Sequence, residues 1–439
     1  MATQLAATSA ISTEPYEATA KLGPVILASF IGTTIEWYDF FIYGTAAALV
    51  FNKLFFPSFD PFVGTLSSFG TFAVGFIARP LGGVIFGHYG DRIGRKAMLV
   101  YSLMIMGVAT FATGLLPTYA TAGVWAPVLL VAMRTAQGLG LGGEWGGAVL
   151  MAVEHSSRSR RGLAGSWPQM GGLAGLLLST LVFTMVTRST SDAEFLAWGW
   201  RIPFLISFVL VGLGMFIRMN LAETPAFAKV KRAGVTQDLP LVTVLRDYRK
   251  NVLLAAGMRL AENSLFYIYT VFVLTYAETK LHVPRSTMLT GVTISAAVGC
   301  VGVPLFGALS DVIGRRRLYL FGALFSMVFA IPFFWLLDTR TPLLMFGAVI
   351  LGLNVGHDAM YGPQAAYFSE LFGTEVRYSG ASVAYQASSV FAGGLAPLIA
   401  TALLATSGSR AVAAYMILMS AITAIAAYCA PETYQHDVA

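Results

Sequence analysis

The segment GHYGDRIGRK, residues 87–96, places four charged side chains, Asp91, Arg92, Arg95 and Lys96, in a chain of 439 residues of which only 11% are charged. Soluble domains carry about 25% charged residues. Long apolar segments flank this loop on both sides, and 56% of the chain is hydrophobic. A helix needs roughly 20 apolar residues to cross a hydrocarbon layer about 30 Å thick. The sequence therefore predicts an all-α integral membrane protein and not a β-barrel, whose strands alternate over about ten residues.

Twelve apolar segments, separated by polar breaks, are long enough to be membrane spans. Six precede the long polar stretch near the middle of the chain, and six follow it. We expect twelve transmembrane helices at about 23–51, 63–87, 97–116, 126–151, 163–187, 200–218, 251–277, 287–309, 318–337, 342–369, 379–404 and 411–430.

The polar stretches divide the chain into five parts. Residues 1–22 form a polar N-terminus, and 219–250 form a linker between two bundles. The bundles cover 23–218 and 251–430, and 431–439 form a tail. With the N-terminus placed in the cytoplasm, 18 Lys and Arg residues fall in cytoplasmic segments and 7 in outer ones. The positive-inside rule then predicts that both termini are cytoplasmic, and it explains the net charge of +6 without a nucleic-acid partner.

The pattern of the charged loop is repeated in GALSDVIGRR, residues 307–316, at an offset of 220 residues. A second pair of motifs, after spans four and ten, repeats at an offset of 216. These repeats predict two pseudo-symmetric six-helix bundles of parallel topology, with a substrate site near the membrane midplane between them. The matching residues are Gly87, Asp91, Gly94, Arg95, Glu154 and Arg161 in the first half and Gly307, Asp311, Gly314, Arg315, Glu370 and Arg377 in the second.

The pattern G-x-x-x-D-R-x-G-R-K resembles the signature loop of the major facilitator superfamily, and RTAQGLGLGGEWGGA (134–148) resembles its span-four motif. Further stretches, TIEWYDFFIYG (34–44), WGWRIPF (198–204) and RYSGASVAYQ (377–386), resemble the metabolite:proton symporter family and most of all its shikimate-type carriers. The resemblance extends over about 22–430. It implies the major facilitator fold and proton-coupled uptake of a small organic acid, such as shikimate or a di- or tricarboxylate, by alternating access.

This resemblance also implies a location and a set of partners. We expect a multi-pass protein of a bacterial inner membrane that acts as a monomer on a small-molecule substrate and protons within a lipid bilayer. No cofactor and no metal are implied. We expect no enzymatic activity, because Walker A, GxSxG, HExxH and CxxC patterns are absent from the sequence.

The charged loops are expected to gate the cytoplasmic side. The resemblance implies that they latch the inner ends of the two halves in the outward-open state. The alternative is that the basic residues set only the topology of the loops. The expected gate comprises Gly87, Asp91, Arg92, Gly94, Arg95, Glu154, Arg161, Asp311, Gly314, Arg315, Glu370 and Arg377.

Ionisable residues inside spans are costly and indicate function. Glu36, Asp39 and Tyr43 share one face of span one, because they lie at positions i, i+3 and i+7. Arg134 lies at a depth that matches Asp39, so we expect an ion pair that protonation of Asp39 would break. Glu36 and Glu144 are the alternative proton sites. Gln137, one turn after Arg134, is an expected substrate ligand.

The second half supplies the remaining candidates. Shifting Asp39 by 220 residues gives Arg259, which we expect to bind a substrate carboxylate with help from Glu262 and Asn263. The alternative for Arg259 and Glu262 is an ion pair within one helix. His357 and Asp358 point about 100° apart, so at most one faces the cavity squarely. Gln386 completes the expected substrate ligands.

The role of Arg79 and the function of the protein each have alternatives. Arg79, which precedes Pro80, is expected to reach toward the membrane surface or to mark a kink. The alternative functions are an osmolyte symporter for proline or betaine, a proton-driven exporter, and a sensor that has lost transport. The intact charges inside the spans argue against the sensor, because such a protein need not bear their insertion cost.

Overall fold

The computed structural model describes residues 22–434, apart from 58, 94, 143–144, 146–148, 150–151, 154–155, 221–243, 245 and 374–376. The part described is helical. The first half contains α1 (Leu22–Leu49), α2 (Phe51–Leu54), α3 (Pro61–Ile93), α4 (Arg95–Leu115), α5 (Tyr119–Ala122), α6 (Trp125–Leu141), the short η1 (Arg158–Arg160), α8 (Arg161–Ser189), α9 (Asp192–Ala197), η2 (Gly199–Arg201) and α10 (Ile202–Asn220).

The second half repeats this arrangement with three interrupted spans. In each, a π-helical segment lies between two α-helices, which keeps backbone groups paired inside the hydrocarbon layer. In the last of the three, a bend at Leu395 separates the π-helical segment from the α-helix that follows. Its elements are α13 (Arg249–Tyr267), η3 (Ile268–Phe272), α14 (Val273–Thr279), α15 (Arg285–Ile313), α16 (Arg315–Asp338), α17 (Pro342–Leu351), η4 (Gly352–His357), α18 (Asp358–Glu370), α19 (Arg377–Ser388), η5 (Ser389–Gly394), α20 (Ala396–Ser407) and α21 (Ser409–Cys429).

Every apolar segment predicted to span the membrane coincides with a helix or with a run of successive helical segments, except that α6 ends at Leu141 and the rest of that span is only partly described. Several helices extend a few residues beyond the predicted ends, because polar residues at the headgroup level continue the helix. Eight of the described helices are long and apolar enough to cross a membrane. Parts of three predicted segments lie outside the described residues. These are 1–21 of the predicted N-terminus (1–22), 221–243 and 245 of the linker (219–250), and 435–439 of the tail (431–439).

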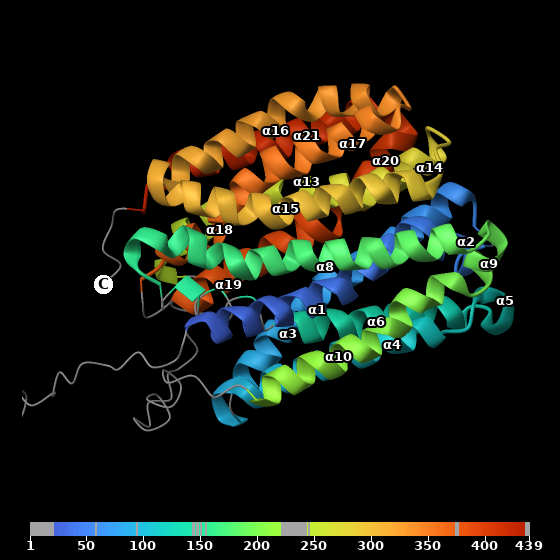
Figure 1. The fold of residues 1–439 in the computed structure, drawn as a ribbon, viewed down its shortest axis with the longest axis horizontal. Coiled ribbons are helices and arrows are strands. Elements are labelled where there is room, and N and C mark those ends of the chain that lie inside the picture. Colours follow the sequence, from blue (N-terminus) through green and yellow to red (C-terminus); the bar gives the residue numbers. More distant parts are fainter. Residues whose placement is uncertain are drawn as a thin grey trace, which may run out of the picture.

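The two halves lie side by side with their helices roughly parallel (Figure 1). α8 of the first half packs against α15 of the second, and α1 packs against α8, so these helices line the interface. We call the end that holds the start of α1 and the end of α15 the inner end. The opposite end, which holds α2 and α14, is the outer end.

Glycines bring α3 and α6 into backbone contact. A Cβ atom on Gly138 would collide with the carbonyl oxygen of Gly75, and one on Gly142 would collide with that of Arg79. Small residues at a crossing let two helices approach closely. The crossing therefore holds Arg79 of α3 and Arg134 of α6 close to each other beside α1.

Candidate substrate and proton site

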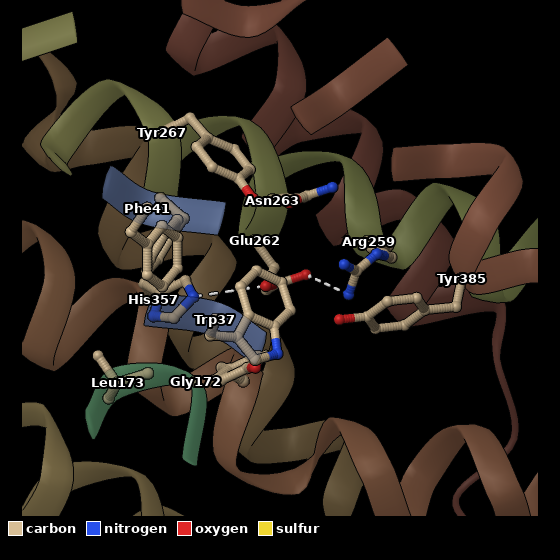
Figure 2. Close-up of a pocket in the computed structure, with 12 residues that line it drawn as sticks. Trp37, Phe41, Gly172, Leu173, Arg259, Glu262, Asn263, Tyr267, His357 and Tyr385 are labelled. Carbon is tan, nitrogen blue, oxygen red and sulfur yellow. Dashed lines mark hydrogen bonds and ion pairs between the residues drawn. The ribbon is translucent and has the colours of Figure 1, made fainter. Parts of the chain in front are cut away.

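A cavity lies between the halves near the middle of the bundle (Figure 2). The space free of atoms at this cavity is about 280 Å³, which includes space open to solvent. Trp37 and Phe41 of α1 line it from the first half, and Arg259, Glu262 and His357 line it from the second. We call this space the central cavity. It combines aromatic faces with charged groups of both signs, which is typical of a site for a small polar organic molecule.

Arg259 is held by a network of buried groups. Its Nη1 atom lies 3.0 Å from Oε2 of Glu262 and 2.9 Å from Oε1 of Gln364. The guanidinium carbon is 3.2 Å from the centre of the Tyr385 ring, and Figure 2 shows the two side chains next to each other. The ion pair within α13, which the sequence left as an alternative, is therefore present. A substrate carboxylate can reach Arg259 only by sharing it with Glu262.

His357 lies between two carboxylates. Its Nε2 atom is 3.4 Å from Oε1 of Glu262, and its Nδ1 atom is 3.0 Å from Oδ1 of Asp358. His357 lines the central cavity, whereas Asp358 lies behind it and accepts a hydrogen bond of 3.0 Å from Asn354. Asn263 also lines the cavity, and its buried Nδ2 atom has no hydrogen-bond partner among the residues described.

Asp39 is 1% exposed. Neither of its carboxylate oxygens has a hydrogen-bond partner within the described part of the chain. The hydroxyl of Thr110 is close to this carboxylate but donates its hydrogen bond to the carbonyl oxygen of Met106 at 2.9 Å. A buried ionised carboxylate without a partner carries a large desolvation cost. Binding a proton removes that cost.

The ion pair predicted between Asp39 and Arg134 is absent from the ion pairs of the described residues. Instead, Nη1 of Arg134 donates to Oε1 of Gln137 at 3.0 Å, and Gln137 donates to Thr110 at 2.8 Å. The equal depth inferred from the sequence does not fix the direction in which a long side chain points. Aromatic rings surround the guanidinium, whose carbon is 4.1, 4.3 and 4.8 Å from the centres of the rings of Phe40, Tyr43 and Phe72.

A second cavity lies on the inner side of the central one, and its atom-free space of about 420 Å³ includes space open to solvent. Trp37 and Tyr385 line both cavities and separate them. Glu36 and Arg79 line only the second one, which we call the inner cavity. Arg79 is 2% exposed, so the expectation that it reaches toward the membrane surface is wrong. The α3–α6 crossing turns it toward the interface between the halves.

The remaining ligands predicted from the sequence are spread over this region. Gln386 lines the inner cavity and donates to the carbonyl oxygen of Gly142 at 3.2 Å. Tyr43 donates to Thr71 at 2.9 Å and lines neither cavity. Glu144 lies outside the described residues.

At the inner end, Asp311 of the second half contacts the start of α8 in the first half. Its two carboxylate oxygens accept hydrogen bonds of 2.8 and 2.9 Å from the backbone N–H groups of Gly162 and Leu163. Free N–H groups at a helix start attract an anion. Arg315 lies 2.7 Å from Asp311 and 3.4 Å from Glu370. This cluster joins the two halves.

The backbone at Gly314 fits its place in the predicted gate. Its φ is +102°, a conformation that favours glycine, and it separates α15 from α16. Arg161 begins α8, and Nε of Arg377 donates to the carbonyl oxygen of Phe372 at 3.3 Å. Of the expected first-half gate, Gly94 and Glu154 lie outside the described residues, and the structure describes only the backbone at Gly87, Asp91, Arg92 and Arg95.

Comparisons with known proteins give the family. The model of the Major Facilitator Superfamily matches residues 27–390. The chain belongs to the major facilitator superfamily. It is 42% identical to the shikimate transporter of Escherichia coli K12, over 94% of this chain and 97% of that protein. An inner membrane metabolite transport protein of the same strain is also 42% identical, over 98% and 99%. A proline/betaine transporter of that strain is 35% identical, over 92% and 82%.

Solved structures agree with this fold. The D-xylose-proton symporter superposes with a TM-score of 0.72 at 18% identity, over 92% of this chain and 96% of that one. The predicted all-α major facilitator fold and the resemblance to shikimate-type carriers are thus confirmed. The chain is a multi-pass membrane transporter and not an enzyme, as predicted. At this identity the symporter structure shows the fold alone.

Several residues of this site were not predicted from the sequence. Gln364 bridges Arg259 and Glu262, with hydrogen bonds of 2.9 Å to each. Glu432 accepts hydrogen bonds of 2.9 and 3.1 Å from the backbone N–H groups that begin α16. Arg79 could have been predicted as a site residue, because it is an ionisable residue inside a predicted span. Neutral residues such as Gln364 and Thr110 carry no comparable signal.

Proposed function

We propose that this protein is a proton-coupled symporter that takes up a small organic acid by alternating access. The observation that carries the proposal is the buried carboxylate of Asp39, which has no hydrogen-bond partner among the described residues and lies beside a chain of groups ending at Arg134. Cycling such a group between its charged and neutral forms changes the cost of the buried state. That is the property a proton-coupling residue needs.

Asp39 is the proposed proton-coupling residue, and Thr110 and Gln137 link it to Arg134. A proton on Asp39 removes the only formal negative charge in this chain of groups. Arg134 is then a buried cation held by aromatic faces and one amide oxygen. A substrate carboxylate supplies the missing negative charge, so proton and acid both act on the state of Arg134. Glu36 and Glu144 stay the alternative proton sites.

The substrate is proposed to bind in the central cavity. Arg259, Glu262 and His357 offer hydrogen-bond donors and acceptors for hydroxyl and carboxylate groups. The ring of Trp37 offers a flat apolar face to a small ring. Relatives at 42% identity include a shikimate transporter, which supports an acid that carries hydroxyl groups. Asn263, Asp358 and Gln386 are proposed to complete the site.

The inner end is proposed to face the cytoplasm, with both termini on that side of a cell inner membrane. The Asp311 cluster would then close the cytoplasmic exit, together with its first-half counterpart at Asp91, Arg92 and Arg95. The support is the contact of Asp311 with the start of α8, which spans the two halves. The transporter is proposed to work as a monomer with a complete site in one chain.

A second candidate substrate is a zwitterion such as proline or betaine. Two observations favour it: the proline/betaine transporter at 35% identity, and a cavity that places a carboxylate, Glu262, near aromatic rings. Aromatic faces attract quaternary ammonium groups. Proton-driven export is the third candidate, and the direction of proton movement separates it from uptake.

The test is transport by the purified wild-type protein in liposomes with an imposed pH gradient, acidic on the outer side. We expect accumulation of one labelled acid among shikimate, 2-oxoglutarate and citrate, with alkalinisation of the external medium as protons enter. Accumulation of labelled proline alone would select the zwitterion. Accumulation of none of them, or loss of preloaded substrate in exchange for entering protons, would contradict uptake by symport.

A further inference from the structure

The inner cavity contains a buried cation, Arg79, with two nitrogen atoms that have no hydrogen-bond acceptor among the described residues. Nε and Nη2 of Arg79 are buried, and neither has a hydrogen-bond partner in the described ranges. The side chain lines the inner cavity and is 2% exposed. Buried donors without acceptors are rare in proteins. This one lines a pocket between the two halves.

Aromatic rings surround the Arg79 guanidinium. Its carbon atom lies 4.2 Å from the centre of the Phe40 ring and 4.3 Å from that of Phe76. The ring of Trp37 is 5.6 Å away. A ring face attracts a cation by its quadrupole but cannot accept the N–H bonds that lie in the plane of the guanidinium. The edge of the guanidinium is therefore positioned for a ligand.

A carboxylate fits this edge best. The planar fork of N–H donors matches the two oxygens of a carboxylate, and hydrogen bonds between charged partners are the strong ones. The ion pairs of the described residues include none with Arg79. Arg259 differs, because Glu262 already occupies it at 3.0 Å.

The inner cavity lies on the path that a substrate takes from the central cavity to the inner end. Trp37 and Tyr385 form the partition between the two spaces. The Tyr385 ring stacks on Trp145, with ring centres 3.7 Å apart and planes inclined by 17°. Trp145 in turn donates to Gln169 of α8 at 3.0 Å. Displacement of Tyr385 would join the two cavities.

We propose that the inner cavity is a second substrate site, in which Arg79 binds the carboxylate of the transported acid after the acid passes Tyr385. This rests on the proposed function, since the ligand is the acid carried by the transporter. The acid exchanges Arg259, which it shares with Glu262, for Arg79, which has no ion-pair partner among the described residues. The partition then closes behind it before the inner end opens.

The first test compares an acid with its uncharged ester. Wild type, Arg79→Gln and Arg79→Lys are assayed for exchange of labelled shikimate in liposomes, with unlabelled shikimate or methyl shikimate as competitor. We expect wild type to bind the acid at least about tenfold more tightly than the ester, as hydrogen bonds to charged groups warrant. Arg79→Gln should lose part of this preference, because Arg259 still binds the carboxylate in the central cavity, and Arg79→Lys should lose less of it. An unchanged preference in Arg79→Gln, whatever the loss of rate, would overturn the proposal.

The second test needs no transport, so it separates this proposal from the proposed function. Thr33 lines the inner cavity and is changed to cysteine after Cys300 and Cys429 are replaced by serine. The rates of reaction with 2-sulfonatoethyl and 2-(trimethylammonio)ethyl methanethiosulfonate are compared with and without Arg79→Gln. We expect the anionic reagent to be favoured only when Arg79 is present. An equal charge preference in both backgrounds would overturn the anion site even if uptake of an acid is established.

Discussion

Nη1 of Arg134 donates a hydrogen bond of 3.0 Å to Oε1 of Gln137, one turn further along α6. The amide of Gln137 donates onward to Thr110 at 2.8 Å, and the Thr110 hydroxyl lies beside Asp39. Thr110 and Gln137 thus lie between the carboxylate and the cation, and no ion pair joins the two among the described residues. In the proposed mechanism, a proton on Asp39 changes the hydrogen bonding of Thr110, and that change passes through Gln137 to Arg134.

Gln137→Leu tests this link. The change removes both hydrogen bonds and leaves an Arg134 N–H without its acceptor, at a cost of about 1–3 kcal/mol for a buried group, whereas Thr110 keeps its bond to the carbonyl oxygen of Met106. We expect proton-driven accumulation to fall by at least about tenfold, as a loss of about 1.4 kcal/mol implies. Uptake under a pH gradient and the unfolding temperature in detergent are the measurements. Thr135→Val is the matched control, because Thr135 bonds only to the carbonyl oxygen of Val131. Equal accumulation in the two variants would contradict the link.

Glu262→Gln tests whether the ion pair of α13 stabilises the fold. It leaves Arg259 as a buried charge with an amide in place of its carboxylate partner. Breaking a buried pair by removing one partner costs about 3–5 kcal/mol. We expect a clearly lower unfolding temperature in detergent for the single variant.

The double variant Arg259→Gln with Glu262→Gln is the control for that loss. Removing both charges should restore much of the stability, because no unpaired charge is left. The double variant should still lose substrate binding, measured by protection against unfolding by the transported acid. A single variant as stable as wild type would show that the pair is not structural.

Asp311→Asn tests the closure of the inner end. The change removes the negative charge that faces the start of α8 and pairs with Arg315 at 2.7 Å. We expect the inner end to open more often, so that a thiol reagent applied to that end modifies Thr33→Cys several-fold faster. Asp338→Asn is the control, because Asp338 accepts its hydrogen bond from Tyr276 within the second half. Equal rates for both variants would rule out the closure role.

Much of the fold could be predicted from the sequence, because the membrane permits few solutions. Backbone groups in hydrocarbon must be paired internally, so each long apolar segment forms a helix. The Gly87 and Gly307 loops showed the duplication, and Asp311 and Arg315 of the second loop do join the halves. The π-helical segments were not predicted, since hydropathy does not distinguish them from α-helix.

The site was predicted less completely. The sequence identified the charged residues, and the structure brings Arg259, Glu262 and His357 together around one cavity. It did not predict their partners, because the direction of a long side chain depends on helix rotation and neighbouring rings. For this reason the predicted ion pair between Asp39 and Arg134 is not formed. Arg79 was expected to reach toward the membrane surface or to mark a kink, but its side chain is buried beside the α3–α6 crossing.

The most direct test of the central claim is uptake by wild type and Asp39→Asn in liposomes, with and without an imposed pH gradient. The asparagine keeps the shape of the side chain but cannot cycle between charged and neutral forms. We predict that Asp39→Asn loses gradient-driven accumulation of the acid while it still exchanges labelled for unlabelled substrate across the membrane. Full gradient-driven accumulation by Asp39→Asn would contradict the assignment of proton coupling to Asp39.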